Sequence, residues 1–189
     1  MGNSKSTPPK ETSGDVTPDV NLEQYRLQVS CFGPLGVQGP VAMDANFNFE
    51  KFRAKHLKDS NDCRKKHGAE PLSLDNHLNK FAQEWAENLA KLNVMKHRLN
   101  NKYGENIAAG YPLSNVNAVK MWYDEVQKYN YQSATFAAGT GHFTQLVWKD
   151  SKRVGVGIAK ASSGMYFIVA NYDPAGNVMG HFAANVAKP

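Results

Sequence analysis

Residues 141–148 (GHFTQLVW) combine a histidine with a compact apolar block that ends in a tryptophan. An imidazole can bind a metal ion or transfer a proton near neutral pH, and either role needs packed neighbours that fix the ring. Phe143, Leu146 and Trp148 would supply that packing for His142. The octapeptide is equally typical of a core segment with one hydrogen-bonded histidine, and alone it does not separate the two interpretations.

A second chemical signal lies at the start of the chain, which reads Met-Gly-Asn-Ser-Lys-Ser. Gly2 behind the initiator methionine, with Ser6 at the required spacing, matches the N-myristoylation pattern. One myristoyl chain binds a bilayer only marginally, with an association constant of roughly 10⁴ M⁻¹, so a stable anchor needs a second signal. Lys5, Lys10 and a basic domain are the expected source of that signal.

The 189 residues suffice for one substantial domain and a tail. Charge is distributed unevenly between these two parts. Three basic and five acidic residues precede Phe47, so this segment carries a net charge of −2, and the remainder must carry +7 to give the formal total of +5. A basic domain favours anionic surfaces, above all acidic lipid headgroups. The sequence contains no DNA- or RNA-binding fingerprint, so nucleic acid is not an expected partner.

Cysteine content and the N-terminal composition indicate a reducing compartment. The two cysteines, Cys31 and Cys63, do not form a disulfide framework. The first 25 residues are polar and interrupted by prolines, unlike a secretory signal peptide. The uncharged stretch 27–43 contains two prolines and three glycines and is therefore a poor spanning helix. We expect a cytosol-facing location.

The elements that must position His142 follow a tail rich in proline, glycine and serine. Residues 1–46 are expected to be a flexible tether and residues 47–189 a folded domain. Helical spacing starts at Phe49 and stops at residues 67–68, where Gly68 follows the helix end. Asp75 is typical of the N-cap of a second helix. The apolar stripe of that helix comprises Leu78, Phe81, Ala82, Trp85, Leu89 and Leu92.

The second half of the chain predicts a turn, a helix and two strands. Residues 103–108 are interpreted as a glycine turn, and a third helix is expected to begin near Ser114 or Asn115. Residues 154–160 and 165–172 have the composition of strands joined by a hairpin turn at residues 162–164. Helices followed by antiparallel strands predict an α+β fold, a sandwich of helices and a sheet.

Four blocks of this sequence resemble the signature motifs of the CAP superfamily. These blocks are residues 103–108 (YGENIA), 122–125 (WYDE), 141–148 (GHFTQLVW) and 168–178 (IVANYDPAGNV). The superfamily includes cysteine-rich secretory proteins, venom antigen-5 proteins and plant pathogenesis-related proteins, and the match spans about residues 48–186. Within it, the chain most resembles the intracellular, N-myristoylated, Golgi-associated branch. The resemblance implies an α-β-α sandwich with a central, mostly antiparallel sheet.

The resemblance also implies a cleft with two histidines and two glutamates. Residue by residue, these fall on His97, Glu105, Glu125 and His142. In similar proteins the histidines bind a divalent metal, often zinc, and neutral imidazoles and carboxylates suit that ion. A hydrogen-bonded polar cluster that ties helices together is the alternative. The remaining histidines are expected to be surface or capping residues: His56, His67, His77 and His181.

Three functions stay open on these grounds. The first is a membrane-associated module, at the cytosolic face of Golgi membranes, that binds anionic lipids, sterols or protein partners. The second is a zinc-dependent hydrolase or peptidase with Glu105 or Glu125 as general base. The third is a dimerising interaction scaffold. Because the sequence contains no HExxH helix or nucleophile elbow, the enzyme is the less favoured interpretation.

Overall fold

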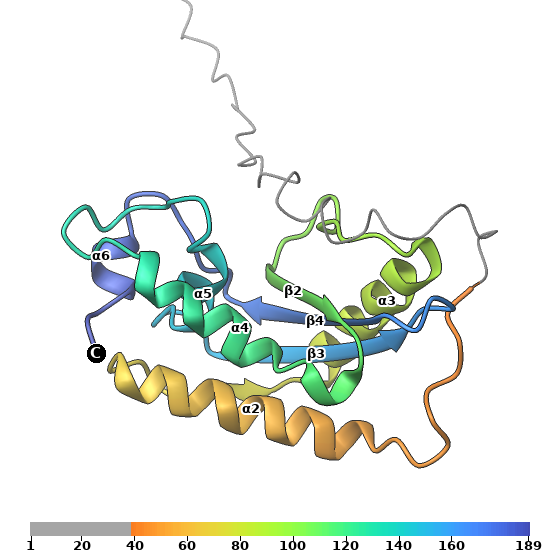
Figure 1. The fold of residues 1–189 in the computed structure, drawn as a ribbon. Coiled ribbons are helices and arrows are strands. Elements are labelled where there is room, and N and C mark those ends of the chain that lie inside the picture. The colour runs from red at the N-terminus through yellow and green to blue at the C-terminus, as the bar shows by residue number, and fades with distance from the viewer. Residues whose placement is uncertain (1–38) are drawn as a thin grey trace, which may run out of the picture.

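The computed structural model describes residues 39–189, so Gly2 and most of the predicted tether lie outside the described residues. Figure 1 shows helices on both sides of a small sheet. The helices are α2 (Phe49–Lys66), α3 (Asn76–Leu92), α4 (Ala118–Asp124), α5 (Gly141–Leu146) and α6 (Phe182–Asn185). The strands are β1 (Ser73–Leu74), β2 (Gly104–Gly110), β3 (Arg153–Lys160) and β4 (Tyr166–Asp173), and 3-10 turns cover Leu113–Asn115 and Glu125–Lys128.

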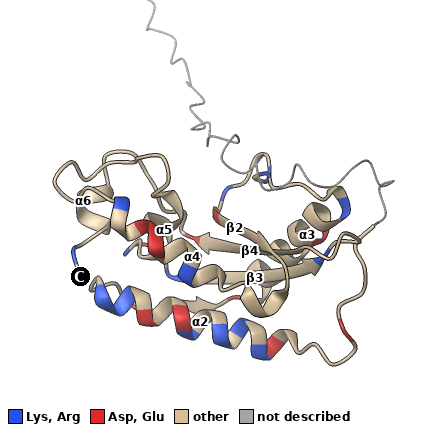
Figure 2. Ribbon diagram, viewed as in Figure 1, with Lys and Arg blue, Asp and Glu red and all other residues tan. Residues whose placement is uncertain are grey.

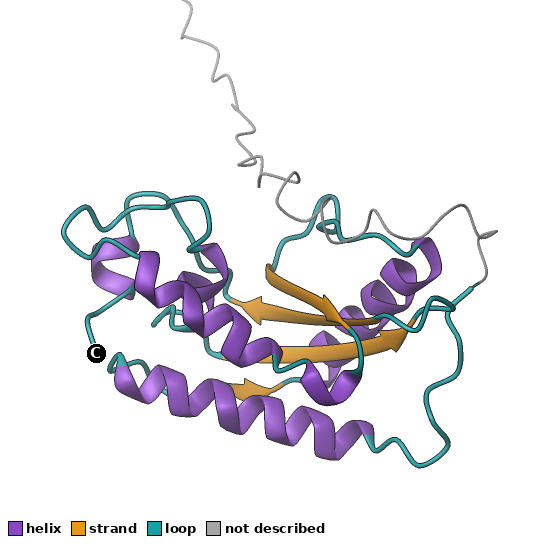
Figure 3. Ribbon diagram, viewed as in Figure 1, coloured by secondary structure: helices purple, strands orange, loops and turns teal. Residues whose placement is uncertain are grey.

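The sheet has the strand order β1-β3-β4-β2 (Figure 3). Strand β4 pairs antiparallel with both β3 and β2, and only the two-residue β1 runs parallel to its neighbour β3. Glu105, Asn171 and Gly155 align across β2, β4 and β3. Since side chains alternate along a strand, these aligned positions face one side of the sheet and the next positions face the other.

Helix α3 covers the face of the sheet to which Glu105 and Asn171 belong. A Cβ atom added to Gly155 would lie 2.0 Å from the backbone carbon of Leu78, and one added to Gly157 would lie 2.4 Å from that of Ala82. Both glycines therefore allow the helix backbone to approach the strand closely. Behind this contact lies a small apolar core of α3 and sheet side chains: Ala82, Trp85, Ala86, Leu89, Ala90, Ile107, Ala159, Ala161, Phe167 and Val169.

The opposite face of the sheet holds the larger core, beneath α2, α4 and α5. Phe143, Leu146 and Trp148, predicted to be core residues, are at most 1% exposed. They pack with the sheet side chains Val154, Val156, Ile158, Ile168, Ala170 and Tyr172. Two helical layers around one mostly antiparallel sheet confirm the expected α-β-α sandwich.

Capping residues mark the helix boundaries in the first half, and two of them, Asp75 and Gly68, were predicted. The Asn48 side chain accepts a hydrogen bond from the Lys51 N–H at the start of α2, and that of Asp75 accepts one from the Leu78 N–H at the start of α3. Helix α2 ends before Gly68, whose φ of +61° suits a residue without Cβ. Of the predicted α3 stripe, the last member is misplaced, because Leu92 at the helix end is 40% exposed.

Two predictions for the middle of the chain are wrong. The segment expected to be a glycine turn is the start of edge strand β2, which runs from Gly104 to Gly110 and pairs with β4 along its whole length. The helix expected from Ser114 or Asn115 starts later, because those residues form a 3-10 turn. The side chain of Asn117 caps the true helix α4 by accepting from the Lys120 N–H.

Basic and acidic side chains are distributed along the length of α2 (Figure 2). Lys55 pairs with Asp59 at 2.5 Å, and Lys58 pairs with Asp62 at 2.6 Å, each one helical turn apart. Among residues 39–189, no helix is both long and apolar in the way that crossing a bilayer requires. Val41 bridges Lys160 of β3, so the chain already contacts the sheet before residue 47, where the domain was predicted to begin.

Candidate functional site

The first histidine–glutamate pair joins the loop after α3 to the start of β2. The Nδ1–H of His97 donates to Oε1 of Glu105 at 2.8 Å. The Glu105 side chain is only 4% exposed, whereas His97 is 49% exposed. The same carboxylate accepts from the Arg98 N–H at 3.0 Å and from the side-chain amides of Asn101 and Asn171 at 3.2 and 3.3 Å. Glu105 is therefore a fixed acceptor that orients the His97 ring.

The second pair joins the 3-10 turn after α4 to the start of α5. The Nδ1–H of His142 donates to Oε1 of Glu125 at 2.8 Å, and Oε2 accepts from the N–H groups of His142 and Phe143 at 2.9 and 3.0 Å. A carboxylate in this position satisfies the free donors at the beginning of a helix. The His142 ring also stacks on Trp122, with 6.3 Å between centroids and 14° between planes. The hydrogen bond at Nδ1 and the stacking on Trp122 thus hold the imidazole in one orientation.

The two pairs lie on opposite sides of the first residues of β2. Glu105 belongs to the face covered by α3, and the next residue, Asn106, to the face covered by α5. The buried Asn106 donates from Nδ2 to the backbone carbonyl of His142 at 2.9 Å. The structure therefore brings His97, Glu105, Glu125 and His142 to the same end of one edge strand, as two hydrogen-bonded pairs. We call these four residues the paired histidine site.

The pairing leaves one ligand atom on each ring. A carboxylate can only accept, so Nδ1 carries the proton in both neutral imidazoles and Nε2 keeps its lone pair. This arrangement, a carboxylate behind a histidine, is the one that metal-binding histidines use. Within residues 39–189, no three His, Cys, Asp or Glu side chains gather as a metal cluster. Metal binding by these residues would therefore use an imidazole Nε2 atom and no cluster of three such side chains within the described chain.

The carboxylates are placed as structural acceptors and not as free bases. Each was a candidate general base, yet Glu105 accepts four hydrogen bonds and Glu125 accepts three. Three amides of the site were not predicted from the sequence: Asn101 and Asn171 donate to Glu105, and Asn106 donates to the His142 carbonyl. Asn106 and Asn171 lie within the blocks that resemble the CAP motifs, but only their strand register shows which face of the sheet each one belongs to.

Two of the histidines predicted to be surface or capping residues are buried: His67 is the C-cap of α2, and His56 is neither a surface nor a capping residue. His56 is 5% exposed and His67 is 1% exposed. His67 ends α2, and its Nδ1–H donates to the Ala187 carbonyl at 2.7 Å while Nε2 accepts from the Tyr123 hydroxyl at 3.2 Å. His56 packs edge-on against Trp122 at 5.4 Å, and its Nε2 has no partner within the described chain. Burial lowers the pKa of His56 to about 4 and also lowers the pKa of His67.

The buried His56 predicts a loss of stability in mild acid. The unfolded ring protonates near pH 6.5, whereas the folded ring stays neutral down to about pH 4, so the unfolded state alone gains a proton in this window. The contribution of this group to the free energy of unfolding should fall by about 2 kcal/mol between pH 7 and pH 5. In urea titrations, His56→Phe should remove that dependence, whereas His77→Phe at an exposed position should keep it. An unchanged pH slope in His56→Phe would contradict the assignment.

Known proteins match most of the part of the chain that the structure describes. The chain matches the family model "CAP: Cysteine-rich secretory protein family" over residues 57–172. It is 44% identical over 146 residues to the Golgi-associated plant pathogenesis-related protein 1 of Homo sapiens, covering 74% of this chain and 95% of the human protein. It is 40% identical over 127 residues to the basic form of pathogenesis-related protein 1 of Nicotiana tabacum, covering 66% of this chain and 71% of the tobacco protein.

A solved structure agrees with these relatives. The crystal structure of NaASP2 with Zn²⁺ has a TM-score of 0.59 and 26% sequence identity, and the match covers 79% of this chain and 92% of that one. The family-model match at residues 57–172 includes three of the four sequence blocks that resemble the CAP superfamily and the start of the fourth. The chain therefore belongs to the CAP family of cysteine-rich secretory proteins.

Proposed function

We propose that this CAP-family chain is a binding module of the cytosolic face of Golgi membranes, and that His97 and His142 bind a divalent metal ion. Its partners would be anionic lipids, with sterols, protein partners or a second copy of the chain as further candidates. One observation carries the metal proposal: each imidazole is held through Nδ1 by a carboxylate at 2.8 Å. That geometry fixes the neutral tautomer in which Nε2 is the ligand atom.

The donor set fits zinc better than it fits a hard cation. Zinc accepts imidazole nitrogen readily, whereas calcium and magnesium prefer six or more oxygen ligands. The relative NaASP2 was crystallised with Zn²⁺, which supports zinc as the first ion to test. His97 and His142 would hold the ion through Nε2, the ring atom that the carboxylates leave free.

The occupied carboxylates favour a binding module over a hydrolase. A general base must reach a proton of its substrate or of a water molecule with a free lone pair. Glu105 and Glu125 already direct their oxygens at backbone and side-chain donors of the protein itself. Using either as a base would uncouple its histidine or open the start of α5. We therefore do not assign a catalytic role to either glutamate.

The membrane proposal rests on charge, on the Gly2 motif and on a relative. The segment after residue 46 carries a net charge of +7, which suits the anionic cytosolic leaflet. A protein 44% identical over 95% of its length is named for its association with the Golgi. Gly2 is the expected acylation site and would supply the hydrophobic anchor. Two weak signals, one acyl chain and one basic domain, would together give stable attachment.

Removal of the acylation site should weaken membrane attachment. At about 1 mM accessible lipid, one myristoyl chain contributes roughly a tenfold increase in the bound-to-free ratio. Gly2→Ala, expressed in a cell that myristoylates, should therefore float with anionic vesicles about tenfold less than wild type. Mass spectrometry of the intact chain should find the acyl mass on wild type alone. Equal flotation of both proteins would overturn the anchor.

A further inference from the structure

The loop between α3 and β2 carries an uninterrupted run of positive charge. From residue 88 to residue 104 the sequence contains four cations and no acidic residue. Lys96 and Lys102 are exposed, Lys91 is exposed at the end of α3, and Arg98 is half-buried. This distribution differs from α2, where lysines alternate with aspartates and pair with them (Figure 2). We call residues 93–103 the basic loop.

An exposed leucine sits at the centre of the basic loop. Leu99 is 87% exposed, the highest fraction among the large apolar residues of the described chain, and Val94 at the loop's start is 42% exposed. An exposed leucine lacks the stabilising free energy of about 1.5–3 kcal/mol that burial of its side chain would contribute. An apolar tip between cations is the arrangement that interfacial membrane proteins present to anionic bilayers, because the tip enters the headgroup layer and the cations stay with the phosphates.

The leucine is held outward by its neighbour. The backbone N–H of Arg98 donates to Glu105, and its guanidinium donates to the Phe81 carbonyl at 3.0 Å and lies 3.8 Å from the Phe81 ring centroid. Asn93 closes α3 with a left-handed φ of 51°, and its side chain accepts from the Ser163 hydroxyl at 2.9 Å. Because the loop is anchored at both positions, Leu99 can contact a surface without a further entropic cost of ordering the chain.

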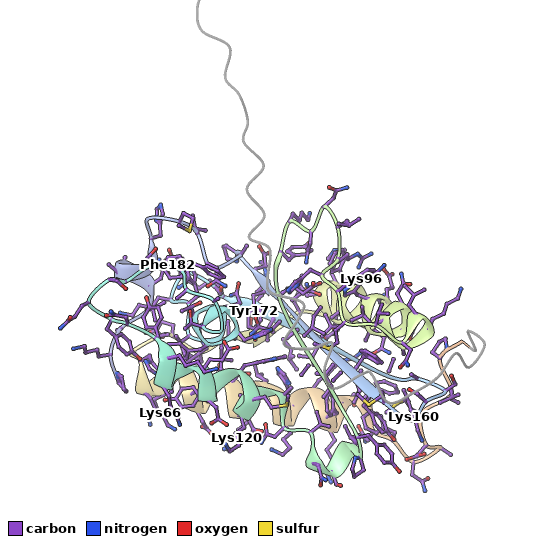
Figure 4. The ribbon with its side chains drawn as sticks, turned by 45° about the horizontal axis from the view of Figure 1, so that its top comes forward. Lys66, Lys96, Lys120, Lys160, Tyr172 and Phe182 are labelled. Atoms are coloured by element: carbon purple, nitrogen blue, oxygen red, sulfur yellow. The ribbon has the colours of Figure 1, made fainter. Side chains whose placement is uncertain are left out.

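A second apolar tip rises on the same side of the molecule. Met179 is 68% exposed and Val178 is 47% exposed, in the segment between β4 and α6. Figures 1 and 4 both show this segment and the basic loop on the side of the sheet away from α2. In Figure 4, Lys96 lies on that side, whereas Lys66 and Lys120 lie at the opposite edge. One face therefore combines apolar tips with the exposed Lys96 and Lys102, whereas Arg98 pairs with Glu84 at 3.4 Å.

We propose that the basic loop is the membrane-docking face, with Leu99 inserting into the headgroup region of an anionic bilayer and Lys96 and Lys102 contacting lipid phosphates. This inference rests on the proposed membrane function and adds to it the surface that makes contact. The orientation follows directly: α2 faces the cytosol, and the paired histidine site lies close to the membrane because His97 belongs to the same loop.

The test is flotation of the full chain with vesicles of phosphatidylcholine containing 30% phosphatidylserine, with Gly2→Ala in every variant so that acylation contributes nothing. Leu99→Ser should lower the partition coefficient about tenfold, from the lost apolar contact. Lys96→Gln with Lys102→Gln should lower it roughly 25-fold, about fivefold for each cation. The matched control is Lys51→Gln with Lys66→Gln on α2, which removes the same charge from the opposite side and should change binding less than twofold.

A tryptophan placed at the tip gives a second readout. The three native tryptophans are at most 8% exposed, so Leu99→Trp adds the one that reaches solvent within the described chain. Its fluorescence should shift to the blue on addition of the anionic vesicles. Two results would overturn the docking face while leaving membrane binding in place. One is an equal loss of vesicle binding in the loop and control variants. The other is full vesicle binding by Leu99→Ser together with no fluorescence shift in Leu99→Trp. No binding by any variant, including the Gly2→Ala parent, would overturn the electrostatic part of the proposed function and this inference with it.

Discussion

Replacing Arg64 with methionine is expected to lower the free energy of unfolding by about 3–5 kcal/mol. Arg64 is fully buried near the end of α2, and it donates to four backbone carbonyls. Nε binds the Glu70 carbonyl at 2.8 Å, Nη1 binds those of Leu146 and Trp148 at 3.1 and 2.8 Å, and Nη2 binds that of Ser151 at 3.0 Å. The methionine would leave these buried acceptors without donors.

The guanidinium keeps its charge in this setting. Burial lowers the pKa of Arg64 to about 10, so the group is still protonated at neutral pH and its hydrogen bonds are charge-assisted. Lysine cannot replace it, because the three nitrogens of the planar guanidinium donate in different directions and a single ammonium cannot reach all of the same carbonyls. Chemical denaturation should therefore place Arg64→Lys close to Arg64→Met. Lys65→Met, at the exposed neighbouring position, is the control and should cost less than about 0.5 kcal/mol. A loss below 1 kcal/mol in Arg64→Met would contradict the structural role.

Replacing Glu125 is expected to separate stability from metal binding. In Glu125→Ala, the N–H groups at the start of α5 lose their acceptor, which should lower the free energy of unfolding by about 2–4 kcal/mol. In Glu125→Gln, the side-chain oxygen can still accept from both N–H groups, so most of that stability should remain. The amide NH₂ would then face Nδ1 of His142 and donate to it. The ring proton must move to Nε2, which removes the lone pair that would bind a metal.

The expected result for Glu125→Gln is a loss of zinc affinity of about 10–100-fold with a nearly unchanged unfolding curve. Nitrogen-15 NMR of the His142 ring should report the change of tautomer directly. Glu105→Gln is the matched variant in the other pair and should affect His97 in the same way. Unchanged zinc affinity in both glutamine variants would show that the carboxylates do not control the rings.

Local signals predicted much of the first half of the fold. Asp75 and Gly68 mark helix ends through capping and a left-handed φ, and both effects depend on a few neighbouring residues. The prediction for the start of β2 was wrong because Gly104, Glu105 and Asn106 have no strand-forming side chains. They pair with β4 because the rest of the edge strand does. Ser114 and Asn117 are both residue types that favour an N-cap. In the structure Asn117 is the N-cap of α4, and local sequence alone could not choose between the two.

Burial of polar groups is where the sequence was least informative. His56 and Arg64 lie on a helix whose other positions are mostly charged, so nothing local distinguishes them from Lys55 or Lys65. The pairing of His97 with Glu105 and of His142 with Glu125 joins residues 8 and 17 positions apart, through a strand edge and a helix start. Family resemblance named the four residues, and the fold alone shows that they form two separate pairs.

Zinc binding by the purified full chain is the measurement that tests the paired histidine site most directly. Isothermal titration with zinc should be carried out on wild type, His97→Ala, His142→Ala and the exposed control His77→Ala. Wild type and the control should bind one zinc per chain, and each site variant should lose at least about tenfold in affinity. Zinc that stays bound with unchanged affinity in both site variants, or a wild-type chain that binds none, would contradict the account.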